Sequence, residues 1–133
     1  WRKYAIPYGS LIYNKPDLKY YFQTPRLSPE YTAADVQAWG KGSEFSVTTL
    51  WPRLADVSFR GVHKMNVPIV FLLGRHDYTV PSPVAADWFA QVKAPSKTLV
   101  WLEHSAHMPM VEEPGHFFAA LLNDVLPLTK EKK

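Results

Sequence analysis

Two short apolar runs, Ile69–Leu73 and Thr98–Leu102, dominate the hydrophobic pattern of the chain. Each is rich in β-branched, leucine or aromatic residues and short for a helix, which favours a strand covered on both faces. Between them Val84, Trp88 and Val92 recur at helical spacing, so we expect one apolar helix stripe there. A strand, a helix and a strand in this order predict a parallel pair joined by a right-handed crossover. The predicted fold class is therefore α/β.

Cap residues mark the ends of the helices expected in this half of the chain. Ser82 followed by Pro83 is typical of an N-cap with proline at the first helical position. Pro114 is expected to open a last helix and Pro127 to end it.

The first 60 residues differ in character, with many Tyr, Trp, Pro and Ser residues and no convincing strand. The clearest helix begins at Thr32, with Asp35 as its capping-box partner and Gly40 as its expected stop. A second short helix is expected over about Ser46–Leu54, although Pro52 disfavours it. The pattern predicts two regions, residues 1–60 and 61–133.

Composition excludes several classes of protein. The chain has 133 residues, 47% hydrophobic and none of them cysteine, which allows one modest core and rules out thiolate chemistry and disulfides. The net charge is +3, partly from the tail Lys130–Lys133, and no basic stripe interleaved with aromatic residues is present, so we expect no nucleic-acid partner. No apolar run approaches the ~18 residues of a membrane span and no signal-peptide pattern opens the chain, so we expect no membrane partner and a cytoplasmic location.

A sheet made only of these strands would be incomplete. Parallel sheets are normally buried on both faces and contain more than two strands, so a lone pair would leave an apolar edge in water. The chain also opens at Trp1 without a methionine. We therefore expect an incomplete domain whose other strands come from a missing N-terminal half.

The candidate chemistry lies just after the two predicted strands. Asp77 follows the first strand and His107 follows the second. Residues beyond the carboxyl ends of neighbouring parallel strands gather at one edge of a sheet, where α/β enzymes place their sites. An acid that orients a histidine, and a histidine that moves a proton, are two members of a catalytic triad.

Plainer interpretations of the same residues stay open. An aspartate after a strand often caps a turn, and a lone histidine often only packs. His76 and His104 are close in sequence to the pair, so a metal cluster is conceivable, but we expect no metal. Glu112 and Glu113 resemble paired carboxylates, although acidic residues in the first turn of a helix are better explained by the helix dipole.

The serine nucleophile of such a triad is missing. The chain has eight serines, none within the Gly-x-Ser-x-Gly turn that exposes a nucleophilic hydroxyl: Ser10, Ser28, Ser43, Ser46, Ser58, Ser82, Ser96 and Ser105. We interpret Ser82 as a helix cap, and Ser105 follows the wrong strand for such a turn.

These motifs resemble the α/β-hydrolase superfamily, whose triad runs nucleophile, acid, histidine along the chain. Residues 67–81, with Gly-Arg-His-Asp-Tyr, look like its acid loop, and residues 103–114, with Ser-Ala-His-Met-Pro, look like its histidine loop. The two motifs are most similar to those of prolyl-iminopeptidase-related serine hydrolases. The resemblance implies that Asp77 is the acid, that His107 is the base and that residues 1–60 are part of a helical cap. Glu30 or Glu44 could then bind a substrate's amine, but neither maps to a motif.

The leading hypothesis is the C-terminal part of a serine hydrolase that cleaves an ester or amide bond of a small molecule or short peptide, without a cofactor. The serine would lie on the missing N-terminal half, so this chain alone should be inactive. The alternative is a non-catalytic module that binds a small ligand on the same fold, which fold alone does not exclude. A free-standing βαβ interaction domain is a third hypothesis, disfavoured by the exposed sheet edge.

Overall fold

The computed structural model describes residues 2–54 and 56–129, and the basic tail Lys130–Lys133 lies outside the described residues. The chain divides into two compact units. The first combines residues 1–21 with 62–133, and the second contains residues 22–61. Whether residues 1–60 serve as a cap concerns the complete protein and stays a prediction. Within the described residues, no helix is both long and apolar enough to cross a membrane.

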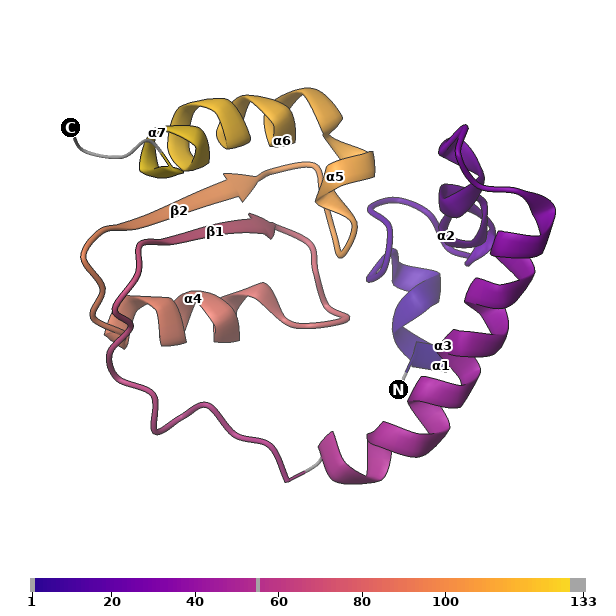
Figure 1. The fold of residues 1–133 in the computed structure, drawn as a ribbon, viewed down its shortest axis with the longest axis horizontal. Helices are drawn as coiled ribbons and strands as arrows, with labels where there is room; N and C mark the ends of the chain where they lie inside the picture. The colour runs from indigo at the N-terminus through magenta and orange to yellow at the C-terminus, as the bar shows by residue number, and fades with distance from the viewer. Residues whose placement is uncertain (1, 55, 130–133) are drawn as a thin grey trace. The chain divides into compact units, whose positions relative to one another are not determined.

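The centre of the first unit is a parallel pair of strands, β1 (Ile69–Gly74) and β2 (Lys97–Leu102), in register from Ile69 opposite Lys97 to Gly74 opposite Leu102. Helix α4 (Ser82–Gln91) joins them and lies on one face, while α6 (Pro114–Ala120) lies on the other (Figure 1). The predicted strand–helix–strand unit and the α/β class are confirmed in this general form. Membership of the α/β-hydrolase fold is not tested by these elements.

Aromatic side chains join α4 to the sheet. The ring of Phe71 in β1 lies 5.9 Å from that of Trp88 and 5.2 Å from that of Phe89. Val92, next to the helix end, is 2% exposed. The Lys97 ammonium group donates to the Phe89 and Val92 carbonyls, which satisfies acceptors that a helix end leaves free. The predicted stripe is confirmed at Trp88 and at Val92, which directly follows α4, and is wrong at Val84, which is 67% exposed.

The remaining helices of this unit are short. They comprise α1 (Arg2–Ala5), the 3₁₀ turn η1 (Ile6–Tyr8), α5 (Pro109–Glu112) and, after α6, the π-helical turn η3 (Leu121–Val125) and α7 (Leu126–Thr129). The prediction that Pro127 ends the last helix is wrong. The Leu126 amide donates to the Leu121 carbonyl across the wider π turn, so Pro127 falls in the first turn of a new segment, where its missing N–H is tolerated.

The second unit contains a long helix, α3 (Ala33–Leu54), preceded by the 3₁₀ turn η2 (Thr24–Leu27), while α2 (Lys19–Gln23) spans the boundary between the units. The predicted capping box is present, because the Thr32 amide donates to Asp35 and the Asp35 amide donates to the Thr32 hydroxyl. The Thr32 hydroxyl also donates to the Asp35 carboxylate, and this bond, followed by the one from the Thr32 amide, lowers the pKa of Asp35.

The predicted stop at Gly40 is wrong, as is the separate helix over Ser46–Leu54. Helix α3 continues through Gly40, which does not adopt the positive φ of a helix-ending glycine. A glycine inside a helix costs only about 1 kcal/mol relative to alanine, which weakens a helix without ending it. Pro52 lies in the last turn of α3, so its missing N–H affects only the end of the helix.

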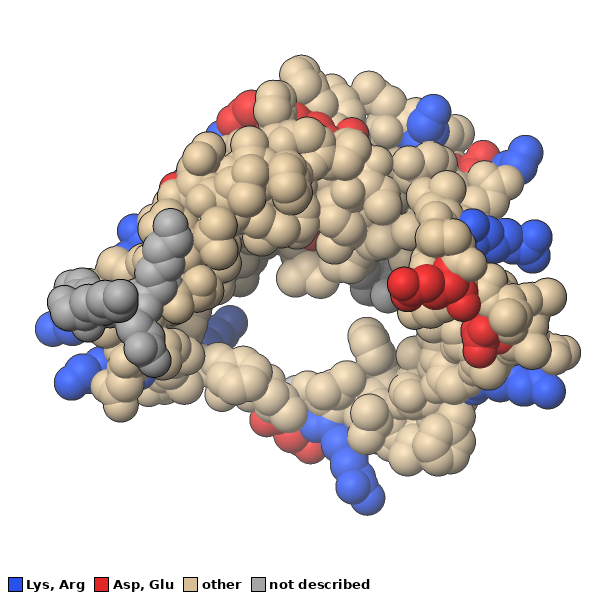
Figure 2. All heavy atoms as spheres, turned by 45° about the horizontal axis from the view of Figure 1, so that its top comes forward, with Lys and Arg blue, Asp and Glu red and all other residues tan. Residues whose placement is uncertain are grey.

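Charged side chains are dispersed over the molecule. In the view of Figure 2 the Lys and Arg side chains stand apart from one another, separated by uncharged surface. Many large apolar side chains are exposed as well, including Phe45, Leu50, Trp51 and Leu54 of α3.

Candidate functional site

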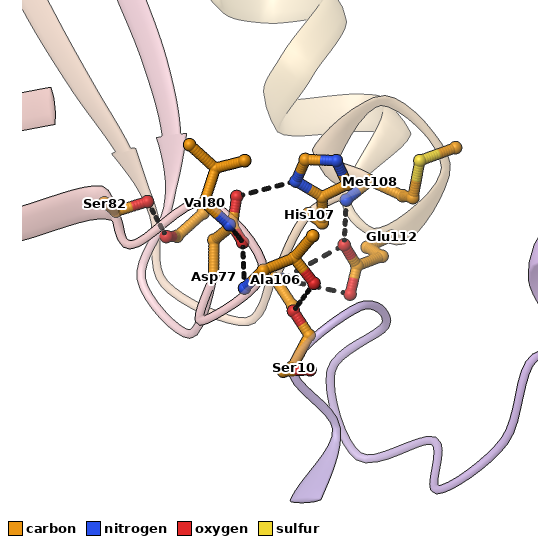
Figure 3. A network of polar contacts seen from close by, with 10 residues as sticks. Ser10, Asp77, Val80, Ser82, Ala106, His107, Met108 and Glu112 are labelled. Atoms are coloured by element: carbon orange, nitrogen blue, oxygen red, sulfur yellow. Dashed lines mark hydrogen bonds and ion pairs between the residues drawn. The ribbon is translucent and has the colours of Figure 1, made fainter. Parts of the chain in front are cut away.

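The loop that carries Asp77 is built by hydrogen bonds among its own residues. The Asp77 amide donates to the Gly74 carbonyl at 3.3 Å, which turns the chain at the end of β1. One carboxylate oxygen of Asp77, Oδ1, accepts the amides of Thr79 and Val80 at 2.8 and 2.9 Å (Figure 3). This turn fixes the carboxylate and leaves its second oxygen free for another partner.

Ser82 closes the same loop, and the prediction that its side chain caps α4 is wrong. Ser82 is the first residue of α4, with Pro81 at the N-cap position and no side-chain cap. Its hydroxyl donates to the Gly74 carbonyl at 2.8 Å, and its amide donates to the Asp77 carbonyl. Ser82 therefore joins the start of α4 to the end of β1.

Asp77 and His107 form a direct pair. The second carboxylate oxygen of Asp77, Oδ2, lies 2.9 Å from Nδ1 of His107 (Figure 3). Neutral histidine bonds a carboxylate through a protonated nitrogen, so this contact favours the tautomer with its proton on Nδ1 and a lone pair on Nε2. The Asp77 side chain is 12% exposed and that of His107 is 33% exposed, so solvent or a substrate reaches the histidine more easily than the acid.

Gly74 permits the two loops to meet. A Cβ atom at this position would lie 1.9 Å from the Ala106 carbonyl oxygen and 2.7 Å from that of Ser105. The His76 amide donates to the Ser105 carbonyl at 2.9 Å, which joins the acid loop to the histidine loop directly. The glycine that ends β1 is therefore required by close approach of backbone.

A segment near the N-terminus, Ser10–Tyr13, supports both loops, and the sequence analysis did not find it. The Ser10 carbonyl accepts the Thr79 hydroxyl at 3.0 Å, and the Leu11 carbonyl accepts the His107 amide at 3.1 Å. Leu11 and Ile12 are nearly fully buried. The signal in the sequence was a glycine, Gly9, followed closely by the apolar pair Leu11 and Ile12. Gly9 has a φ of +71° and makes a turn, and the apolar pair after it is buried.

The two adjacent glutamates lie at helix starts, as expected, and they also bond the histidine loop, a role that the sequence did not indicate. Glu112 accepts the amides of Ala106 and Met108, and Glu113 accepts the His104 amide and the Ser105 hydroxyl. Burial acts to raise the pKa of Glu113, but its hydrogen bonds together outweigh that effect and lower it.

An exposed ion pair fastens the beginnings of the two loops. Arg75 donates two hydrogen bonds to Glu103, and its guanidinium lies 3.8 Å from the centre of the Trp101 ring. The hydrogen bond from Arg75 lowers the pKa of Glu103, and the same bond raises that of Arg75. Because the pair is exposed, it contributes little to stability.

The other histidines near the pair have structural contacts. His76 stacks on Tyr13 with ring centres 4.1 Å apart, and His104 lies at a tilt to the same ring. Over the described residues, no group of three or more His, Cys, Asp or Glu side chains is placed to bind a metal ion.

No serine of the chain contacts the imidazole of His107 within the described residues. Ser105 is fully buried and donates to Glu113, and Ser10 Oγ is buried with no hydrogen-bond partner among the described groups. The arrangement therefore contains an acid and a histidine, with the outer nitrogen of the histidine available to a further group.

Two surface hollows lie apart from the pair. One, of about 170 Å³, is lined in part by Tyr13, Tyr20, His104 and Glu112, and neither Asp77 nor His107 lines it. Another, of about 380 Å³ in the second unit, is lined in part by Arg26 and Tyr31. Glu30 and Glu44, the glutamates considered for an amine, are exposed residues of the second unit.

Comparison with known proteins gives a partial match. A Bacillus subtilis (strain 168) protein described as "Probable aminopeptidase YbaC" is 34% identical over 89 residues, which are 66% of this chain. The matched stretch spans 28% of that relative's length. No protein-family model matches the chain, and no solved structure matches it. The chain is thus similar over most of its length to a small part of a protein named as an aminopeptidase, which is consistent with a hydrolase.

Proposed function

We propose that this chain supplies the acid, Asp77, and the base, His107, of a Ser-His-Asp triad in a serine hydrolase of the α/β-hydrolase superfamily. The observation that carries the proposal is the 2.9 Å contact between Asp77 Oδ2 and His107 Nδ1 beyond the carboxyl ends of adjacent parallel strands. A catalytic triad requires this arrangement, because the acid fixes the tautomer of the histidine and Nε2 can then accept the proton of the serine.

The proposed reaction is acyl transfer to serine and then to water. The serine oxygen forms a bond to the substrate carbonyl carbon while its proton moves to Nε2 of His107. His107 returns that proton to the leaving oxygen or nitrogen as the scissile bond breaks. Water then repeats the sequence on the acyl-enzyme, and Asp77 stabilises the imidazolium each time.

The unpaired edge of β1 supports the proposal that the nucleophile lies on polypeptide outside these residues. The Ile69 amide donates to the Ser96 carbonyl, so the N–H and C=O groups of Val70 and Leu72 point away from β2. Among the described residues only β2 pairs with β1. A further strand on this edge would satisfy these groups and extend the sheet toward a Gly-x-Ser-x-Gly turn.

The name of the Bacillus subtilis relative supports an amide substrate with a free amino terminus. We therefore propose an aminopeptidase that removes one N-terminal residue from a short peptide.

The test uses the complete protein that carries this chain and a panel of aminoacyl p-nitroanilides. His107→Gln and Asp77→Asn should each lower kcat by about 10³-fold or more, because triad members act as a unit. His63→Gln is the matched control, since His63 is exposed and only its backbone carbonyl bonds the Lys93 amide. An unchanged kcat in His107→Gln would exclude the triad. A protein that binds these compounds without turnover would instead support the small-ligand module.

A further inference from the structure

We propose that Glu112 is a positioning residue for His107, an inference that rests on the proposed function. Its carboxylate bonds the backbone on both sides of the histidine. Ala106 donates its amide to the two oxygens at 3.1 and 3.0 Å, and Met108 donates to Oε2 at 2.8 Å (Figure 3). The residues on either side of His107 are therefore both bonded, through their amides, to one side chain.

The amide of His107 itself is bonded from another direction, by the Leu11 carbonyl at 3.1 Å. The same carboxylate of Glu112 also accepts the Tyr13 amide at 2.5 Å. Glu112 therefore bonds both the histidine loop and the segment whose Leu11 bonds His107. Its removal would take away the acceptor of the Ala106 and Met108 amides and one bond of the segment that carries Leu11.

The remaining amides of the loop show why Glu112, rather than its neighbour, has this role. Glu113 accepts the His104 amide, and the Ser105 amide donates to the Leu102 carbonyl. These bonds fix the beginning of the loop, at residues that precede Ala106. Loss of Glu113 should therefore affect the position of the imidazole less than loss of Glu112.

A carboxylate suits this position better than an amide does. Three N–H groups converge on the two oxygens of Glu112. Glutamine has one acceptor oxygen, and its NH₂ group would face at least one of these donors. Glu112→Gln thus preserves size while leaving N–H groups unpaired.

The consequence for catalysis follows from geometry. The Asp77–His107 contact is a single hydrogen bond, and a small displacement of the imidazole would lengthen it. A misplacement of about 1 Å in a catalytic group can lower the rate by about 10²-fold. Since Glu112 touches none of the reacting atoms, its effect should appear in kcat and leave KM nearly unchanged.

The test combines NMR and kinetics on the complete protein labelled with ¹⁵N-histidine. In the parent protein we expect a downfield Nδ1–H signal from His107, assigned by its absence in His107→Gln. Glu112→Gln should remove or strongly weaken this signal and lower kcat by about 10²-fold. Asp87→Asn, the control, removes an exposed carboxylate of α4 away from both loops and should change neither readout.

Glu113→Gln separates positioning from stability. Both glutamates anchor the loop, so a merely structural role predicts equal effects of the two substitutions on the Nδ1–H signal. We expect the signal to persist in Glu113→Gln. If Glu112→Gln fails to fold, Glu112→Asp tests the positioning role instead. Its shorter carboxylate should weaken the Nδ1–H signal and lower kcat by about tenfold, because the rate depends on the position of the imidazole.

An unchanged Nδ1–H signal together with an unchanged kcat in Glu112→Gln, or in the aspartate variant, would overturn the positioning role. Equal effects of Glu112→Gln and Glu113→Gln on the signal would also overturn it. Full activity in His107→Gln would instead contradict the proposed function, while the NMR signal would still report whether Glu112 positions the imidazole.

Discussion

The loops that carry Asp77 and His107 are supported in different ways. The acid loop closes on itself, because its main bonds join residues between Gly74 and Ser82. The histidine loop is bonded by the carboxylates of Glu112 and Glu113, which lie four to nine residues from their partners, and by a distant group, the Leu11 carbonyl. The acid loop thus folds around the carboxylate of Asp77 itself, whereas the histidine loop folds around the carboxylates of Glu112 and Glu113.

The comparison explains why the two loops should respond differently to substitution. Substitution of Asp77 removes the acceptor on which its own turn closes. Substitution of Glu112 or Glu113 leaves His107 in the chain but removes acceptors from the backbone around it. Asp77 and His107 stay in contact only while both kinds of support are present.

The largest expected effect on stability comes from Gly74, where the two loops touch. Gly74→Ala would place a methyl group 1.9 Å from the Ala106 carbonyl oxygen, with backbone on both sides of the clash. We expect a loss of about 3 kcal/mol in the free energy of unfolding, measured by urea denaturation, because overpacking against backbone relaxes poorly. Gly115→Ala is the control, since an added Cβ there meets nothing within 4 Å. Equal stabilities of the two variants would mean that the loops do not approach as described.

A smaller effect is expected within the acid loop. Ser82→Ala removes the 2.8 Å bond to the Gly74 carbonyl from a residue that is 2% exposed. We expect a loss of about 1 kcal/mol in the free energy of unfolding, the usual contribution of one hydrogen bond. Ser43→Ala, at an exposed position in α3, should change stability by less than about 0.5 kcal/mol. If the two variants were equally stable, Ser82 would not join α4 to β1.

The smallest expected effect is the pH dependence of the histidine loop. Burial acts to raise the pKa of Glu113, but hydrogen bonds from Ser105, His116 and the His104 amide outweigh it and lower the pKa below the ordinary value of 4.5. The resulting stability is full above that value and is lost as the pH falls through the lower pKa of the folded state. Glu113→Gln should therefore flatten the decline of stability with acidification below about pH 4.5, measured as urea midpoints across the acid range.

Glu30→Gln serves as the control for this measurement, since Glu30 is exposed in the second unit. The urea midpoint of Glu30→Gln should change with pH across the acid range as that of the parent protein does. If Glu113→Gln also retained the parent's acid dependence, the carboxylate of Glu113 would not be a bonded acceptor in the folded state.

The same division into local and distant support describes what the sequence could predict. The two strands could be predicted because each is a short apolar run, which is a local signal. The placement of Asp77 and His107 at one edge of the sheet then followed from the rule that the carboxyl ends of parallel strands lie together. The capping box at Thr32 was found for the same reason. The predictions at Gly40 and Pro127 were wrong for another reason. A long helix tolerates the small free-energy cost of one glycine, and the π turn before Pro127 lets the chain begin a new helical turn there.

The supports of the histidine loop could not be predicted from local pattern. Nothing near Leu11 indicates that its carbonyl bonds the His107 amide, since the two residues are far apart in the chain. Glu112 and Glu113 looked like ordinary acidic residues at a helix start, and only the folded position of the loop shows their partners. A polar group whose partner lies elsewhere in the chain leaves no periodic signal.

The most direct test of the central claim is a double-mutant cycle on Asp77 and His107 in the complete protein, measured as kcat/KM for an aminoacyl p-nitroanilide. If the two residues act as one unit, Asp77→Ala and His107→Ala should each lower kcat/KM by about 10³-fold or more, and the double variant should be little worse than the weaker single variant. Losses that multiply in the double variant, or a single variant with full activity, would contradict the account.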